Sequence, residues 1–264
     1  MMVSTSRQRI AAIAHNTFRE TVRDRVLYNL VLFALLLTVS TIFLGAAAAS
    51  QDAKIIVDLG LSATLLFGAF IAVFVGVGLV WKEIERRTLY IILAKPVGRA
   101  EFLVGKYFGL CVTLAVNVVV MAAGVSLVLM WVEGADTPLA LRVWPTVGLI
   151  YLELTILTGV ALLFSAFSSP ILSTLASIAV FVIGHLATDL KGFAMLLDAG
   201  ALRALVLGIY YALPNLTHFS FITPTAHGIT PTAAHLAGAF AYAVLWNAVL
   251  VSAAALAFRR RDLK

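Results

Sequence analysis

The chain has 264 residues, of which 62% are hydrophobic and only 12% are charged, and its mean hydropathy is +1.02. A water-soluble domain of this length needs charged side chains over most of its surface, so the composition excludes that class. The net charge of +6 would suggest a nucleic-acid partner for a soluble chain, but in a membrane protein the positions of the basic residues report topology. We therefore predict an all-α membrane protein that binds no nucleic acid.

Residues 1–25 are predicted to form a cytoplasmic amphipathic helix. Apolar residues recur at helical spacing from Ile10 to Val22, and basic and polar residues fill the opposite face. Such a basic face suits the cytoplasmic leaflet of a membrane, where Lys and Arg meet anionic lipid headgroups. A soluble helix packed on a partner is the alternative.

Six stretches of the chain are long and uncharged enough to cross the hydrocarbon, which takes about 20 helical residues. Ser168, Ser169 and Pro170 mark a turn between the fourth and fifth stretches, and Thr230 with Pro231 would open the last. The transmembrane domain is expected at 26–258, with spans at about 26–49, 59–81, 103–132, 143–166, 171–188 and 233–258, an external segment at 189–232 and a cytoplasmic tail at 259–264.

The first of these stretches, and one further apolar piece of the chain, require separate interpretation. The first resembles a signal peptide near its end, at 44–50, but the 25 residues before it are too long a basic segment, so a retained helix is favoured. Within the external segment, the apolar piece from Leu205 to Leu213 is cut short by Pro214. This piece cannot cross the bilayer and is predicted to be interfacial or re-entrant.

The basic residues indicate the orientation, because cytoplasmic loops retain Lys and Arg. With six spans, all but four of the 19 Lys and Arg residues lie in the N-terminal segment, the loop between the second and third spans, and the tail. The exceptions are Lys54, Arg142, Lys191 and Arg203. We expect both termini to be cytoplasmic in a multi-pass protein of a bacterial cytoplasmic (inner) membrane, since the chain is rich in Ala and Val.

Charge is concentrated in the second-to-third loop, from Trp81 to Gly109. A short helix is predicted to run to Ala94, because Pro96 cannot continue it. A solvated, basic cytoplasmic loop is the alternative interpretation of any single residue there. The features in order are Glu83 or Glu85, Arg87-Thr88, Lys95-Pro96, Gly98, Arg99 and Lys106.

This order resembles the first cytoplasmic loop of ABC-2 type permeases, and within them it is most similar to the group serving multicopper-enzyme maturation. The resemblance implies a type V exporter-like fold of six transmembrane helices, with an N-terminal elbow helix and a cytoplasmic coupling helix. It also implies that two such subunits pair as a homo- or heterodimer in the lipid bilayer, each docking on a separate ABC ATPase subunit. The residues implied in ATPase coupling are Glu83, Glu85, Arg86, Arg87, Thr88, Lys95, Pro96, Arg99 and Glu101.

No G-x-x-x-x-G-K-[ST] phosphate loop occurs in the chain. Its one Gly-Lys pair, Gly105-Lys106, is followed by Tyr107 and lacks the earlier glycine. We therefore expect this chain to be no enzyme and to carry no cofactor, with ATP and Mg bound by the partner subunit. Gly105 and Gly109 form a G-x-x-x-G motif, which permits close helix approach but is common by chance.

Polar groups inside the predicted spans are candidates for a transport pathway. Glu153 lies near the middle of the fourth span, where an ionisable side chain is costly unless it faces a cavity, a partner or the dimer seam. A neutral, hydrogen-bonded Glu153 is the alternative. Asn117 and His185 complete the candidate pathway, and His185 is expected to share a helix face with Asp189.

The predicted function is export of an amphiphilic or lipid-like substrate, because the span faces are otherwise apolar. A proton-coupled secondary transporter using Glu153, or a non-transporting scaffold of an ABC assembly, remains an alternative. The external histidines His218, His227 and His235 lack the spacing and companion ligands of a metal centre, so no metal site is expected.

Overall fold

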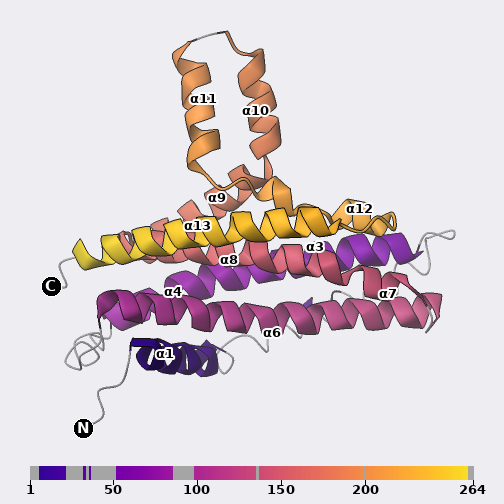
Figure 1. The fold of residues 1–264 in the computed structure, drawn as a ribbon, viewed down its shortest axis with the longest axis horizontal. Coiled ribbons are helices and arrows are strands. Elements are labelled where there is room, and N and C mark those ends of the chain that lie inside the picture. The colour runs from indigo at the N-terminus through magenta and orange to yellow at the C-terminus, as the bar shows by residue number, and fades with distance from the viewer. Residues whose placement is uncertain are drawn as a thin grey trace.

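The computed structural model describes residues 6–21, 32–33, 36, 52–85, 98–134, 137–198 and 200–260, and within them it contains helices and no strand. Long helices lie side by side as a bundle (Figure 1). They are α3 (Asp52–Phe70), continued by η2 (Ile71–Val75) and α4 (Gly76–Glu85), then α6 (Arg99–Glu133), α8 (Trp144–Phe167) and α13 (Ala233–Arg260). The short α7 (Leu139–Arg142) precedes α8.

The described residues include four helices long and apolar enough to cross a membrane, or up to six if each of two bent helix pairs counts as one span. The continuous helix of the second span contains a π-helical turn, Ile71–Val75, that the sequence did not reveal. Between the fourth and fifth elements, α8 ends at Phe167 and α9 (Pro170–His185) begins at Pro170, so the turn lies at Ser168 and Ser169.

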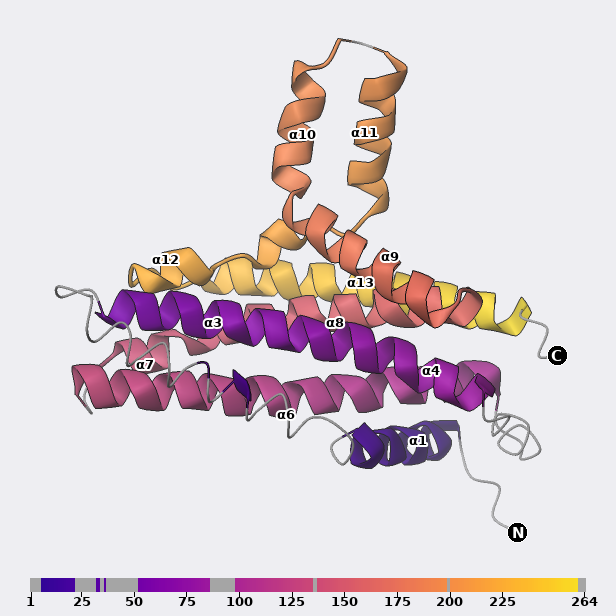
Figure 2. The ribbon, with the colours of Figure 1, turned by 180° about the vertical axis from the view of Figure 1, so that it is seen from behind.

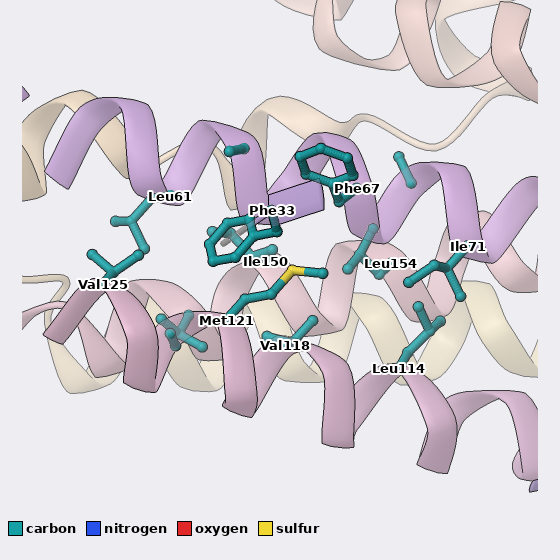
Figure 3. Packing of buried hydrophobic residues seen from close by; sticks show 14 of the residues in the cluster. Phe33, Leu61, Phe67, Ile71, Leu114, Val118, Met121, Val125, Ile150 and Leu154 are labelled. Carbon is teal, nitrogen blue, oxygen red and sulfur yellow. The ribbon is translucent and has the colours of Figure 1, made fainter. Parts of the chain in front are cut away.

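The main core lies where α3, α6 and α8 meet (Figure 3). Side chains from these helices and from η2 interdigitate there, and they include Leu61 of α3, Ile71 of η2, Leu114 and Met121 of α6, and Leu154 of α8. Of the expected first span at 26–49, the structure describes only residues 32–33 and 36. Phe33 is buried in this core, and its ring meets that of Phe67 edge-on with centroids 6.0 Å apart.

The fifth expected span, 171–188, is not one straight helix. After α9 the chain bends by 67° into α10 (Ala187–Leu196). With α11 (Ala201–Ala212), α10 forms a hairpin that projects away from the bundle (Figures 1 and 2). A Cβ on Gly184 would lie 2.7 Å from Leu216 Cγ and 2.9 Å from the Pro214 carbonyl oxygen, so the returning chain crosses α9 just before the bend.

The expected external segment, 189–232, is therefore largely helical. Besides α10 and α11 it contains η3 (Leu216–Phe219) and α12 (Ile222–Ala226). With Thr230 as the N-cap, the last long helix was expected to begin at Pro231. It begins two residues later, at Ala233. The hydroxyl of Thr232, not Thr230, accepts the His235 N–H at 3.2 Å, because Pro231 comes before the helix and not inside its first turn.

Candidate functional site: the junction of α1 with α6 and the buried Glu153–His185 contact

The amphipathic helix α1 (Ser6–Thr21) packs across the beginning of α6 (Figure 2). The two glycines of the G-x-x-x-G motif form this contact. A Cβ on Gly105 would lie 2.7 Å from Ile13 Cβ, and one on Gly109 would lie 2.6 Å from Thr17 Cβ. The motif thus lets the two backbones approach closely, as small residues do at helix contacts in membranes. Sequence reasoning noted the motif but could not say which helix it meets.

Two ion pairs flank the glycines. Arg9 Nη2 lies 3.1 Å from Glu101 Oε1, with both side chains about a fifth exposed. Lys106 Nζ lies 3.4 Å from Glu20 Oε2, and the Lys106 side chain is only 3% exposed. The Lys106 ammonium also lies 5.6 Å from the centre of the Phe102 ring. Opposite charges on α1 and α6 therefore fix the position of α1 along α6 as well as its distance.

Glu101, expected to contact an ATPase, has local roles in this structure. Its Oε2 accepts the Gly98 N–H at 3.2 Å and so caps the start of α6. α6 has 35 residues and is longer than a bilayer's hydrocarbon core, so its first turn projects beyond that core. Hydrogen bonds from Ser6 and Gly98, together with the charge and hydrogen bond of Arg9, lower the pKa of Glu101. The carboxylate is thus held ionised against α1.

The contact between Glu20 and Lys106 gives a testable expectation. Glu20→Gln removes the carboxylate facing a buried ammonium, and we expect it to weaken the docking of α1 by about 1–3 kcal/mol. The measurement is the rate at which trypsin cleaves within α1 in the detergent-solubilised chain. His15→Gln alters an exposed residue of the same helix, leaves its trypsin sites unchanged, and serves as the control. Equal cleavage rates in the two variants would contradict the assigned contact.

The described residues at the two ends of the expected coupling segment, 82–85 and 98–101, lie at the same end of the bundle. α4 ends at Glu85 beside the start of α6 (Figure 2). The rings of Phe102 and Phe258 stack with centroids 6.4 Å apart, which brings the end of α13 there too. The side chains of Glu83, Glu85 and Arg99, and all of Arg86, Arg87, Thr88, Lys95 and Pro96, lie outside the described residues.

A second candidate site lies inside the bundle, between α8 and α9. Glu153 is 1% exposed, and its Oε1 lies 3.2 Å from His185 Nε2. The distance is that of an ion pair, although the orientation does not meet hydrogen-bond geometry. His185 Nδ1 lies 3.0 Å from the Phe181 carbonyl oxygen, which positions the ring. The expected pairing of His185 with Asp189 on one helix face is wrong, because α9 ends between them.

Asn117, the third predicted pathway residue, is fully buried and donates its Nδ2–H to the Thr113 carbonyl oxygen at 2.8 Å. Sequence reasoning missed another polar contact in the interior. Asn247 of α13 donates its Nδ2–H to Thr155 Oγ1 of α8 at 2.9 Å. A lone asparagine within an otherwise apolar span was the available signal, since such a group must find a partner.

A bundle of long apolar helices, with an amphipathic helix packed at one end, defines a multi-pass membrane protein. The match to known families is specific. Residues 11–263 match the family model described as ABC-2 family transporter protein, and the chain belongs to that family. A search among curated proteins finds no match.

Proposed function

We propose that this chain is the permease subunit of an ATP-driven ABC-2 type exporter and couples to a separate ATPase subunit through residues 82–101. The observation that carries the proposal is the family match over 11–263, which spans this segment. The end of the bundle where α4, α6 and α13 meet also holds α1. A movement of the segment between α4 and α6 would therefore be transmitted to the first turns of α6, on which α1 packs.

The arrangement of the complete transporter is part of the same proposal. A second permease subunit, identical or related, pairs with this chain within the lipid bilayer. ATP and Mg bind the ATPase subunits and not this chain. The end of the bundle that carries α1 faces the cytoplasm of a bacterium, since the basic residues gather there.

An apolar groove supports an amphiphilic or lipid-like substrate. A hollow of about 290 Å³ lies between α3–η2 and α9, and apolar side chains line it throughout. Phe70 of α3 and Phe74 of η2 line it, together with Phe181 of α9 and Leu157 of α8. Phe181 and Leu157 lie one helical turn from His185 and Glu153 respectively, so an apolar tail in the groove would end near a polar pair.

The Glu153–His185 contact favours one alternative, a proton-coupled transporter, since the two groups could share a proton inside the membrane. A non-transporting scaffold of an ABC assembly is a variant of the main proposal. Both alternatives make different predictions about the bound ATPase and its response to substrate.

The test is co-purification from membranes in mild detergent. We expect the wild-type chain to carry an ATPase subunit and ATP hydrolysis, and the triple variant Glu83→Ala, Arg87→Ala, Arg99→Ala to lose both. Removing three charged contacts at about 1.5–3 kcal/mol each would weaken a micromolar interface beyond recovery.

The matched control changes one acidic and two basic residues at the opposite end of the bundle, Lys54→Ala, Glu133→Ala and Arg142→Ala, whose side chains are exposed. It should retain the ATPase. If wild type recovers no ATPase under any condition, the ATP-driven proposal fails and the proton-coupled alternative takes its place. ATP hydrolysis that no amphiphile stimulates in vesicles would favour the scaffold.

A further inference from the structure

A cavity of about 270 Å³ lies beside the first turns of α13, away from both sites described above. His235, Gly238, Ala239 and Tyr242 line it from one face of α13, and His218 of η3 lines it from the other side. The first turns of α13 are about 35 Å along the helix from Phe258, which marks the α1 end of the bundle. The cavity therefore has no part in the proposed ATPase coupling.

Two residues that line this cavity, His235 and Tyr242, have hydrogen-bonding groups that no described residue satisfies. His235 Nε2 is buried and has no partner among the described residues. The Tyr242 oxygen accepts the Asn215 N–H at 2.7 Å, and no described residue accepts its hydroxyl hydrogen. The rings of His218 and Tyr242 meet edge-on with centroids 5.2 Å apart, so the second imidazole lies beside the phenol. A buried donor without a partner is costly, which points to a ligand that accepts its hydrogen bond.

The lining chemistry selects an anion over a metal ion. No carboxylate lines the cavity, and the described residues contain no group of three His, Cys, Asp or Glu able to hold a metal. Imidazoles and a phenol can all donate a hydrogen bond to one acceptor. The volume is close to the lower limit of ligand pockets and exceeds the need of a bare ion.

We propose that this pocket binds a phosphate group, carried either by a phospholipid headgroup or by free phosphate. His235 and Tyr242 donate to the phosphate oxygens from α13, and His218 donates from η3. Gly238 also lines the pocket, and a Cβ placed there would meet no atom within 4 Å.

The test is calorimetric titration of the full chain in uncharged detergent. The probes are inorganic phosphate, a short-chain phosphatidylglycerol, and the matching diacylglycerol without phosphate. We expect phosphatidylglycerol to bind and the diacylglycerol not to bind at this site. Binding of inorganic phosphate as well would identify a site for the free anion, whereas binding of the lipid alone would identify a headgroup site. Both results support the shared chemistry.

Two variants and two matched controls assign the binding to the pocket. His235→Gln removes the imidazole donor. Gly238→Leu fills space in the pocket, and its Cβ meets no atom within 4 Å. Each variant should weaken binding about tenfold or more. His227→Gln changes a histidine of the same segment outside the pocket, and Gly208→Leu fills open space on α11. Both controls should bind as wild type does.

Several results would overturn the proposal. One is that neither phosphate compound binds, and another is that the two controls lose binding as much as the pocket variants. A third is tight binding of Zn²⁺ that His235→Gln abolishes, with no phosphate binding, since that would make the pocket a metal site.

Discussion

Gly109→Ala is expected to detach α1 from α6, although the change adds a single methyl group. The new Cβ would lie 2.6 Å from Thr17 Cβ and 2.7 Å from the Ala14 carbonyl oxygen. The second contact is with backbone, which cannot rotate aside, so α1 itself must move. Overpacking of this kind costs about 1–3 kcal/mol in well-packed interiors. That range is enough to undock a helix of 16 residues that contacts α6 along one face.

The measurement is trypsin cleavage within α1 of the detergent-solubilised chain, read by mass spectrometry, together with thermal unfolding of the bundle. We expect cleavage to accelerate about tenfold or more while the bundle stays folded. Gly148→Ala is the control, because a Cβ at that position on α8 meets no atom within 4 Å. In a helix interior the same substitution is otherwise favourable by about 1 kcal/mol. Equal protection of α1 in both variants would show that Gly109 does not set its position.

The second large effect concerns Glu153 and His185. We expect His185→Leu to destabilise the chain more than the double variant Glu153→Leu, His185→Leu does. The single change leaves a carboxyl group that is 1% exposed facing an apolar side chain, whereas the double change leaves an apolar contact. Interhelical polar contacts in membranes are worth about 0.6–1.7 kcal/mol, so a coupling energy of about 1 kcal/mol or more is expected.

The measurement is a double-mutant cycle on unfolding in a denaturing detergent. His227→Leu supplies the control cycle with Glu153→Leu. His227 is exposed, and its Nδ1 lies 2.9 Å from the Thr223 carbonyl oxygen, so these two changes should add within about 0.5 kcal/mol. If Glu153 and His185 also prove additive, the contact between α8 and α9 does not stabilise the bundle. Glu153 would then need another reason for its burial, such as carrying a proton.

Some features of the site were visible in the sequence and others were not. The charged loop and the amphipathic helix could be located because each is a property of a short, continuous stretch. The helix that packs on Gly105 and Gly109 could not be identified from the sequence. A G-x-x-x-G motif allows any helix to approach closely, including a helix of a second subunit. Two ion pairs, Glu20 with Lys106 and Glu101 with Arg9, form because α1 packs on α6. No local sequence pattern specifies that packing.

The class of the protein, the helical nature of its described segments and the position of the turn at Ser168 and Ser169 could all be predicted from the sequence. These follow from local physics: charges are excluded from hydrocarbon, backbone groups in lipid must bond within a helix, and proline restricts where a helix begins. The packing of the helices was needed to show that His185 meets Glu153 and not Asp189, and that the chain bends after α9. Both depend on which helices cross and at what distance, and uniformly apolar faces do not specify this.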